Sequence, residues 1–420
     1  MASRGQCSRL RGDGGGGGAA ALPADVLFEV LLRLAAKDVC RLRAVCRAWR
    51  AVACDAAFAA THAARHRATL LVGGVLDFES FPSVDVLLMD LSGNVVKRVR
   101  HSGTHLVLPT RLDLVCVTES YSCNAALLNP VTGAALPLPQ GLSRAHAPRR
   151  QLSDFDGSFK YGRASNGDYK VLRVLTDHRN KQRPEQIFEI LTLGEGGHAR
   201  TPWRAIAALP LCVRTDAIGG AVVNGVVHFL LDGRPNGGAG DGDQPEPEMD
   251  SMALFDLKTE KWTSFLQGPI TSYPELNSID DILPEPQEME VYQNLSMAEL
   301  NNVLVVAQHT DYRDPKIDSF VDLWYLVDSD KDTWDRKHRI GLGKTAQDAE
   351  HYFPWVNPSL VLDDGRIVIY IHVARSNVQG QYTRRLVRLY DPETETLSSD
   401  LVDVRNIHSL GFFTGSLLGV

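Results

Sequence analysis

The sequence lacks the marks of a membrane, secreted or disulfide-bonded protein. No run reaches the roughly 18 consecutive apolar residues that a membrane-spanning helix needs. The first residues carry three arginines and then the glycine run 14–18, without the apolar core of a signal peptide. The seven cysteines are scattered and form no CxxC pair, so neither a disulfide framework nor a zinc site is expected. We therefore expect an intracellular protein, in the cytoplasm, the nucleus or both, with no cofactor.

An excess of positive charge is also missing. The 44 Lys and Arg residues are outnumbered by 51 Asp and Glu, for a formal net charge of −7. Nucleic acids and anionic membranes are bound through a basic surface, so we expect neither as a partner. The chain of 420 residues is 44% apolar and 23% charged, which is typical of a globular protein with two or three domains.

Motifs that could indicate catalysis are weak. His62 and His66 stand four residues apart on a predicted helix, but no glutamate between them could act as a base, so we expect a role on the helix surface. The GEGG stretch at 194–197 lacks the spacing and lysine of a phosphate-binding loop and fits a hairpin turn better. No GxSxG elbow is present. The sequence therefore predicts no catalytic residue and no metal ligand.

The clearest boundary is a change of hydrophobic period near residue 68. Apolar residues recur at helical spacing before it, and short alternating runs separated by turn residues follow it. We expect an α+β multidomain chain with a flexible Gly/Ala-rich leader over residues 1–20, a small all-α domain over 21–67 and an all-β domain over 68–420. So small a helical domain buries little of its apolar surface by itself. Either another protein or the chain's own β domain is expected to cover it.

The helical segment carries an ordered series of motif residues. They are Leu22-Pro23, Arg33-Leu34, Lys37, Arg41, Arg43, Val45-Cys46-Arg47, Trp49, Asp55, Phe58 and His62. In this order the segment resembles the F-box of plant proteins, with one departure at Ala35, where the family usually has proline. The resemblance implies binding to the Skp adaptor, and through it to a cullin and a RING ubiquitin ligase. The positions that it carries over to the adaptor contact are Leu22, Pro23, Leu27, Leu31, Leu34, Val39, Leu42, Val45 and Trp49.

The all-β region repeats a loose unit. Six turn elements, among them NPVTG at 129–133 and FDLKTEKW at 255–262, alternate with tight hairpins that contain Asn-Gly, Asn-Asn or Asp-Gly. This pattern predicts about six four-stranded blades, and the region resembles the plant F-box-associated, kelch-like β-propeller. A propeller must close its ring, and the first blade is one strand short, so we expect residues 409–418 to complete it. Aromatic residues that recur in the blades are expected in the core; they are Trp203, Trp262, Trp334 and Tyr390.

These features together predict the substrate-recognition subunit of a Skp–cullin–F-box ubiquitin ligase, without catalytic activity of its own. The F-box would bind the Skp adaptor and the propeller an unknown protein substrate. Tyr352, Phe353 and Trp355 are candidate substrate contacts, although they could instead fill a space between blades. Two other interpretations stay open at this stage. One is an F-box scaffold outside a ligase, and the other is a propeller enzyme or carbohydrate-binding protein with a helical cap.

Overall fold

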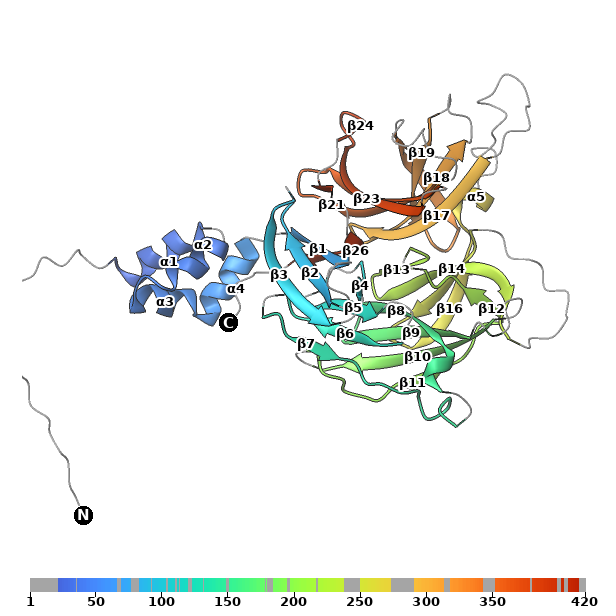
Figure 1. Ribbon diagram of the computed structural model, residues 1–420, viewed down its shortest axis with the longest axis horizontal. Helices are drawn as coiled ribbons and strands as arrows, with labels where there is room; N and C mark the ends of the chain where they lie inside the picture. Colours follow the sequence, from blue (N-terminus) through green and yellow to red (C-terminus); the bar gives the residue numbers. More distant parts are fainter. Residues whose placement is uncertain are drawn as a thin grey trace, which may run out of the picture. The chain divides into compact units, whose positions relative to one another are not determined.

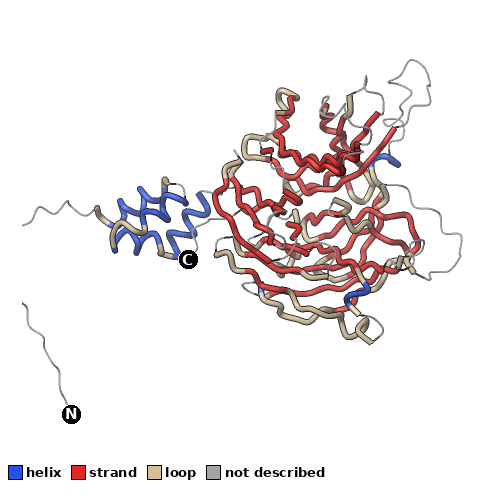
Figure 2. The backbone as a smooth tube through the Cα atoms, viewed as in Figure 1, coloured by secondary structure: helices blue, strands red, loops and turns tan. Residues whose placement is uncertain are grey.

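The computed structural model divides between Arg67 and Ala68 into two compact units. It describes residues 22–414 apart from 35, 66–68, 77–82, 92, 103–104, 110–111, 113, 120–122, 131, 149–150, 178, 180–183, 195–196, 217, 238–249, 273–290, 313–317, 343–351, 378–379, 399–401 and 404–406. The leader predicted for residues 1–20 and the departure at Ala35 therefore lie outside the described residues. Figures 1 and 2 distinguish a helical unit from a unit built of strands.

The first unit, called the helical module below, consists of four short helices. They are α1 (Ala24–Leu32), α2 (Ala36–Leu42), α3 (Arg47–Ala53) and α4 (Ala56–Arg65). Pro23 precedes α1, where its missing N–H costs nothing, and Asp25 in the first turn faces the positive end of the helix dipole. Leu31, Val39 and Phe58 are fully buried and join the helices in one small core.

Polar side chains of the motif tie these helices together. The Arg43 guanidinium donates two hydrogen bonds, of 2.8 and 3.2 Å, to the Ala53 carbonyl at the end of α3, where helix carbonyls lack partners. Asp55 caps α4, because its carboxylate accepts the Phe58 amide hydrogen at 2.9 Å. His62 is completely buried, and its Nε2 donates to the Leu34 carbonyl at 2.8 Å.

The prediction that His62 lies on the helix surface is therefore wrong. Its ring packs 5.8 Å from the ring of Phe58, and its polar edge hydrogen-bonds the end of the segment after α1. A buried imidazole is stable there because a hydrogen bond offsets the loss of contact with water. His66, its expected neighbour on the helix, lies outside the described residues.

The second unit is a β-propeller of six blades, each an antiparallel sheet (Figure 1). The first three blades comprise β26 (Ile407–Thr414), β1 (Thr69–Leu76), β2 (Ser83–Met89) and β3 (Val95–Ser102); β4 (His105–Val107), β5 (Val115–Glu119), β6 (Ala125–Leu128) and β7 (Ala135–Pro137); and β8 (Asp156–Arg163), β9 (Tyr169–Asp177), β10 (Glu185–Leu193) and β11 (Arg204–Ile206). A short 3₁₀ helix, Leu152–Asp154, precedes β8.

The other three blades follow in chain order. They comprise β12 (Leu211–Val213), β13 (Gly220–Val223), β14 (Val226–Pro235), β15 (Met252–Asp256) and β16 (Lys261–Leu266); β17 (Val291–Leu300), β18 (Val303–Tyr312), β19 (Phe320–Asp328) and β20 (Thr333–Gly341); and β21 (Tyr352–Val361), β22 (Ile367–Asn377), β23 (Gly380–Asp391), β24 (Thr396–Leu397) and β25 (Val402–Asp403). A short helix, α5 (Pro269–Ser272), follows the fourth blade. The prediction of about six blades is confirmed.

The last strand closes the ring, as the sequence predicted. β26 pairs antiparallel with β1, so the C-terminal strand completes the first blade, and Figure 1 draws red β26 beside blue β1. Its bounds, Ile407–Thr414, begin and end earlier than the predicted 409–418. The hydroxyl of Ser409 also accepts the Val107 amide hydrogen at 2.6 Å, which ties β26 to the second blade.

Turn chemistry fixes the register of the blades. Asn224 and Gly225 have φ of 50° and 81°, and Asn301 and Asn302 have 51° and 63°, which a tight two-residue hairpin requires. Five of the outer turns begin with an Asp or Asn whose side-chain oxygen accepts a backbone N–H a few residues later. These residues are Asp90, Asn129, Asp256, Asp328 and Asp391. Such turns need no tertiary contact, which explains why the sequence indicated them.

The core lies between blades and is tied across them by tryptophans. Buried clusters fill the spaces between the third and fourth, fourth and fifth, and fifth and sixth blades, among others. The indole N–H groups of Trp203, Trp262 and Trp334 each donate to a carbonyl just after the preceding blade's outer strand, at 2.7, 2.8 and 2.9 Å. Trp203, Trp334 and Tyr390 are buried, and half-buried Trp262 packs against the core, so all four pack as expected.

Candidate functional sites

Helix α1 has two different apolar faces. Leu27 and Leu31 point into the core of the helical module. Val26 and Val30 stand four residues apart, which places them on one side of the helix, and Leu22 lies two residues before the first residue of α1. These three, called the outer stripe below, are 41–49% exposed although each is apolar. A contiguous apolar strip left in water is a feature of binding surfaces, so it is the candidate contact of this unit.

The residues predicted to contact an adaptor are thus divided between the interior and the surface. Leu27, Leu31 and Val39 are buried in the module's own core, and Leu34, Leu42 and Trp49 are partly buried against it. Leu22, Pro23 and Val45 are exposed. The predicted set does not include the exposed Val26 and Val30, because helical spacing shows that apolar residues share a helix but not which ones its neighbours cover.

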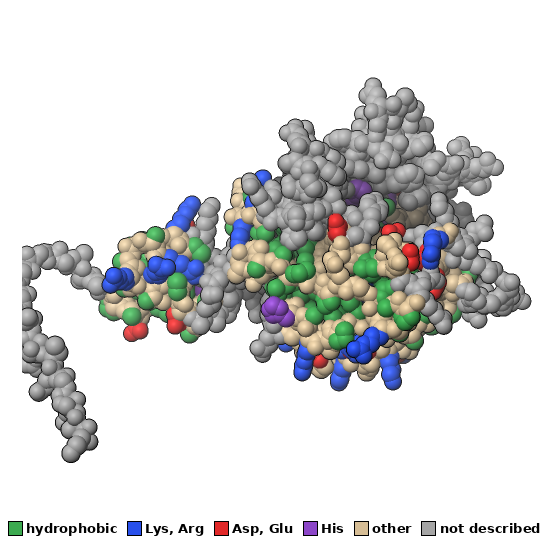
Figure 3. All heavy atoms as spheres, turned by 60° about the horizontal axis from the view of Figure 1, so that its bottom comes forward, with side chains coloured by type: hydrophobic (Ala, Val, Ile, Leu, Met, Phe, Trp, Pro, Cys, Tyr) green, Lys and Arg blue, Asp and Glu red, His purple; other side chains and the backbone are tan. Residues whose placement is uncertain are grey.

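Charged groups surround the apolar ones on this module. On the face seen in Figure 3, basic side chains lie among apolar ones. Arg41 pairs with Asp38 at 3.3 Å across exposed positions, a type of contact that adds about 0.2–1 kcal/mol of stability at most. Arg47 and Arg50 are also exposed.

Of the three candidate substrate contacts, one can be placed. Trp355 on β21 is exposed, and its ring lies 5.2 Å from that of His372 on the paired strand β22. It is therefore accessible and does not plug a space between blades. Tyr352 and Phe353 lie on the same strand, but their side chains are outside the described part of the structure.

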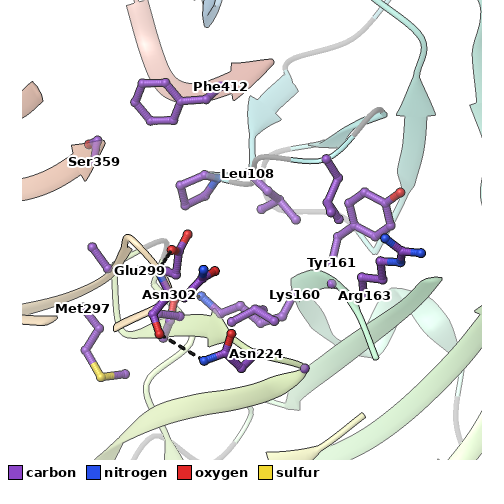
Figure 4. Close-up of a pocket in the computed structure, with 18 of the residues that line it drawn as sticks. Leu108, Lys160, Tyr161, Arg163, Asn224, Met297, Glu299, Asn302, Ser359 and Phe412 are labelled. Atoms are coloured by element: carbon purple, nitrogen blue, oxygen red, sulfur yellow. Dashed lines mark hydrogen bonds between the residues drawn. The ribbon is translucent and has the colours of Figure 1, made fainter. Parts of the chain in front are cut away.

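The propeller also contains a cavity of about 690 Å³ on its axis, called the axial cavity below. All six inner strands or the residues next to them contribute to its lining: Phe412 of β26, Leu108 after β4, Lys160 of β8, Gly220 of β13, Glu299 of β17 and Asn357 of β21. Figure 4 draws Phe412, Leu108, Lys160 and Glu299 on different strands around it. The hairpin turns at one end are joined by a hydrogen bond of 3.0 Å from the Asn224 amide to the Asn302 carbonyl. The volume is that of a small-molecule site.

Other site classes find little support in the described residues. No group of three or more His, Cys, Asp or Glu side chains there is arranged to hold a metal ion. No helix in the described part of the chain is long and apolar enough to span a bilayer.

A four-helix module with exposed apolar side chains, followed by a closed six-bladed propeller, defines a class of two-domain proteins. The F-box-like family pattern matches residues 19–60, and that of the F-box associated beta propeller domain matches residues 96–409. The chain therefore belongs to the plant F-box proteins with an F-box-associated β-propeller.

Relatives agree with this assignment. One F-box protein of Arabidopsis thaliana is 25% identical over 76% of this chain and 73% of its own length. Another from the same plant is 23% identical over 91% of this chain and 88% of its own. An F-box/kelch-repeat protein of Arabidopsis thaliana is 25% identical over 50% of this chain and 58% of its own.

Solved structures resemble the chain only distantly. A putative 6-phosphogluconolactonase from Bacteroides fragilis has a TM-score of 0.38 and 10% identity, covering 82% of this chain and 98% of its own. The β-propeller domain of Nup133 from Vanderwaltozyma polyspora has a TM-score of 0.34 and 8% identity, covering 76% and 85%. Scores this low carry no argument about function.

Proposed function

We propose that the chain is the substrate-recognition subunit of a Skp–cullin–F-box ubiquitin ligase. The F-box binds the Skp adaptor through the outer stripe, Val45 and Pro23, and the propeller binds the protein that is ubiquitinated. The single observation that carries this proposal is the outer stripe itself. Three apolar side chains at four-residue intervals remain 41–49% exposed in a module that already has its own core.

The chemistry of such a subunit is proximity. F-box proteins are in general non-catalytic adaptors, and ubiquitin transfer belongs to the RING subunit and its conjugating enzyme. Holding a target beside the charged conjugating enzyme turns a bimolecular encounter into an effectively intramolecular one. No catalytic group of the chain itself is required for that role.

The test is the affinity of the full-length chain for a purified plant Skp adaptor. The double variant Val26→Asp, Val30→Asp places two carboxylates in the proposed contact. Lost apolar burial and buried charge together cost about 3 kcal/mol, or roughly 100-fold in Kd. Val327→Asp is the control, because Val327 is an exposed valine of the propeller, 63% exposed, and the Kd of this variant is expected to stay unchanged.

The far-ultraviolet circular dichroism of the variants shows whether the helices stay folded. Wild-type affinity in the folded double variant would refute the proposed contact. Adding the cullin, RING subunit and conjugating enzyme then separates a ligase subunit from a scaffold. Conjugates that form on a captured protein with the wild type, and not with the double variant, support the ligase role. Adaptor binding without any conjugates would make the chain a scaffold.

A second experiment tests whether the propeller binds its substrate through Trp355. An exposed tryptophan is the side chain most often found at the energetic centre of a protein interface. Trp355→Ala is expected to reduce capture of the substrate from plant cells in which the proteasome is blocked, with adaptor binding and the melting temperature unchanged. A large fall in the melting temperature would assign the ring to the blade's own packing.

A further inference from the structure

Lys160 brings a positive charge to the wall of the axial cavity. It lies on β8 and is only 7% exposed. Its ammonium group donates one hydrogen bond, of 2.8 Å, to the Gly220 carbonyl, whereas an ammonium has three donors. A Cβ at position 220 would stand 2.9 Å from the Lys160 Cε, so glycine there makes room for the side chain. Burial lowers the pKa of Lys160 to about 8, and the amine remains mostly charged at pH 7.

Asn357 brings an unsatisfied acceptor to the same wall. It lies on β21, is also 7% exposed, and its side-chain oxygen has no hydrogen-bond partner among the described residues. A buried carbonyl without a partner is costly, so such groups are rare and usually have an explanation. Asn357 is among the residues that line the axial cavity, and a rotation of its side chain toward the cavity would let a ligand supply the missing donor.

Two other charged residues line the cavity, and the structure gives each a polar partner. The Glu299 carboxylate accepts the Asn302 amide hydrogen at 2.6 Å. Arg163 donates to the Gly167 carbonyl at 3.3 Å, and its guanidinium carbon lies 5.5 Å from the ring centre of Tyr169. Figure 4 shows Arg163 and Glu299 on different sides of the cavity, with Lys160 between them.

The rest of the wall is mixed, with polar side chains from Ser165, Asn224, Asn302 and Ser359 and apolar ones beside them. Leu108, Met297 and Phe412 line it from three different blades. A site with an apolar body, one buried cation and one buried acceptor is typical of pockets that bind a small organic molecule in a fixed orientation.

We propose that the axial cavity binds a small organic acid whose acidic oxygens accept hydrogen bonds from Lys160, whose N–H or O–H group donates to Asn357, and whose apolar body packs against Met297 and Phe412. A charge-assisted hydrogen bond in a buried site is roughly twice as strong as a neutral one, so the acid group dominates selectivity. This site is independent of the F-box contact and of any ligase activity.

The test compares two dyes with the same ring system. The anionic dye 1-anilinonaphthalene-8-sulfonate and the neutral dye N-phenyl-1-naphthylamine both fluoresce in apolar surroundings, and each is titrated into the full-length protein at pH 7. The sulfonate dye is expected to bind one site at least tenfold more tightly than the neutral dye. In Lys160→Met that preference should vanish, because methionine keeps the apolar stem and removes the charge. Equal binding of both dyes to the wild type would overturn the proposal.

Lys170→Met is the matched control. Lys170 is another buried lysine, on β9, but it donates to the Leu257 carbonyl and to Glu260 and does not line the axial cavity. Its variant is expected to keep the tenfold preference. If Lys160→Met is unfolded at the temperature of the titration, Ser359→Phe replaces it as the test. The phenylalanine fills the cavity from β21 and should weaken the binding of both dyes at least tenfold. Unchanged dye binding in Ser359→Phe would place the dye elsewhere and overturn the proposal.

Discussion

At the scale of single residues, the propeller buries histidines in their neutral form. His309 on β18 is buried, and neither ring nitrogen has a hydrogen-bond partner among the described residues. Burial lowers its pKa from 6.5 to about 4. His228 on β14 is also buried, and its pKa is likewise lowered to about 4. Both histidines must lose water to fold, and water favours the charged form.

Acid is therefore expected to destabilise the propeller through these two residues. Between pH 6.5 and 4 the unfolded chain binds more protons than the folded one, so the free energy of unfolding falls as the pH falls. Each histidine contributes a slope of up to about 1.4 kcal/mol per pH unit in that range. Above pH 6.5 both histidines are neutral in the folded and the unfolded chain, so the free energy of unfolding there is not lowered by their protonation. Urea unfolding of the wild type at pH 7, 5.5 and 4.5 measures the slope.

His309→Leu removes one of the two titrating groups without adding a polar one. Its free energy of unfolding should depend less steeply on pH between 6.5 and 4, while at pH 7 the substitution costs little because the imidazole there forms no hydrogen bond. The same slope in wild type and variant would show that His309 binds its proton equally in the folded and the unfolded chain, contrary to the lowered pKa that its burial produces.

The residue scale also limits what the sequence can predict about the F-box. Its pattern of apolar spacing indicated helices from Leu22 to about Arg67, and the structure has four between Ala24 and Arg65, because local spacing alone defines an amphipathic helix. Val26 and Leu27 are adjacent and almost equally apolar, yet one is exposed and the other buried. Leu27 is buried because Val39 of α2 and Phe58 of α4 pack against its side of α1. The sequence around Val26 and Leu27 does not show which side those helices cover. His62 was placed on the surface for the same reason.

At the scale of the blade, the repeated tryptophans act as ties between neighbours. The Trp262 indole donates to the Ala207 carbonyl of the third blade's exit at 2.8 Å, and its ring lies 5.1 Å from Phe255 and 5.2 Å from Phe188. Trp262→Phe removes the donor and part of the ring. We expect the free energy of unfolding to fall by about 1–3 kcal/mol, from a lost hydrogen bond and a small cavity.

Trp355→Phe makes the same chemical change at an exposed ring and should alter stability by less than about 0.5 kcal/mol. Chemical denaturation of both variants measures the difference. If the two substitutions cost the same, the inter-blade hydrogen bond contributes nothing beyond ring size.

Turns were the most predictable elements of the propeller. Asn-Gly and Asn-Asn hairpins and the Asp-initiated outer turns are stabilised by their own residues, so the sequence located blades through them. The axial cavity was not predicted. Lys160 and Asn357 are almost 200 positions apart in the chain, and only closure of the ring brings their strands around one axis. Sequence alone offered no reason to connect them.

At the scale of the whole molecule, stability depends on the joint between the two ends of the propeller. Removing residues 407–420 deletes β26, leaves β1 with an unpaired edge and takes Leu410 and Phe412 out of the core beside the sixth blade. We expect the truncated chain to be insoluble. A soluble truncation with a cooperative melting transition would mean that closure is not needed.

A milder test keeps β26 and disturbs only its contact with the second blade. Gly411 lies where β26 meets the second blade, and a Cβ there would stand 2.6 Å from both the Leu108 carbonyl oxygen and a methyl group of Val107. Since a backbone oxygen cannot move aside without shifting its strand, Gly411→Ala is expected to lower the free energy of unfolding by about 1–3 kcal/mol. Gly341→Ala on β20 meets nothing within 4 Å and should change stability by less than about 0.5 kcal/mol. Equal melting temperatures for the two alanine variants would mean that the contact between the first and second blades can loosen without lowering the stability of the propeller. Closure of the ring would then not determine that stability.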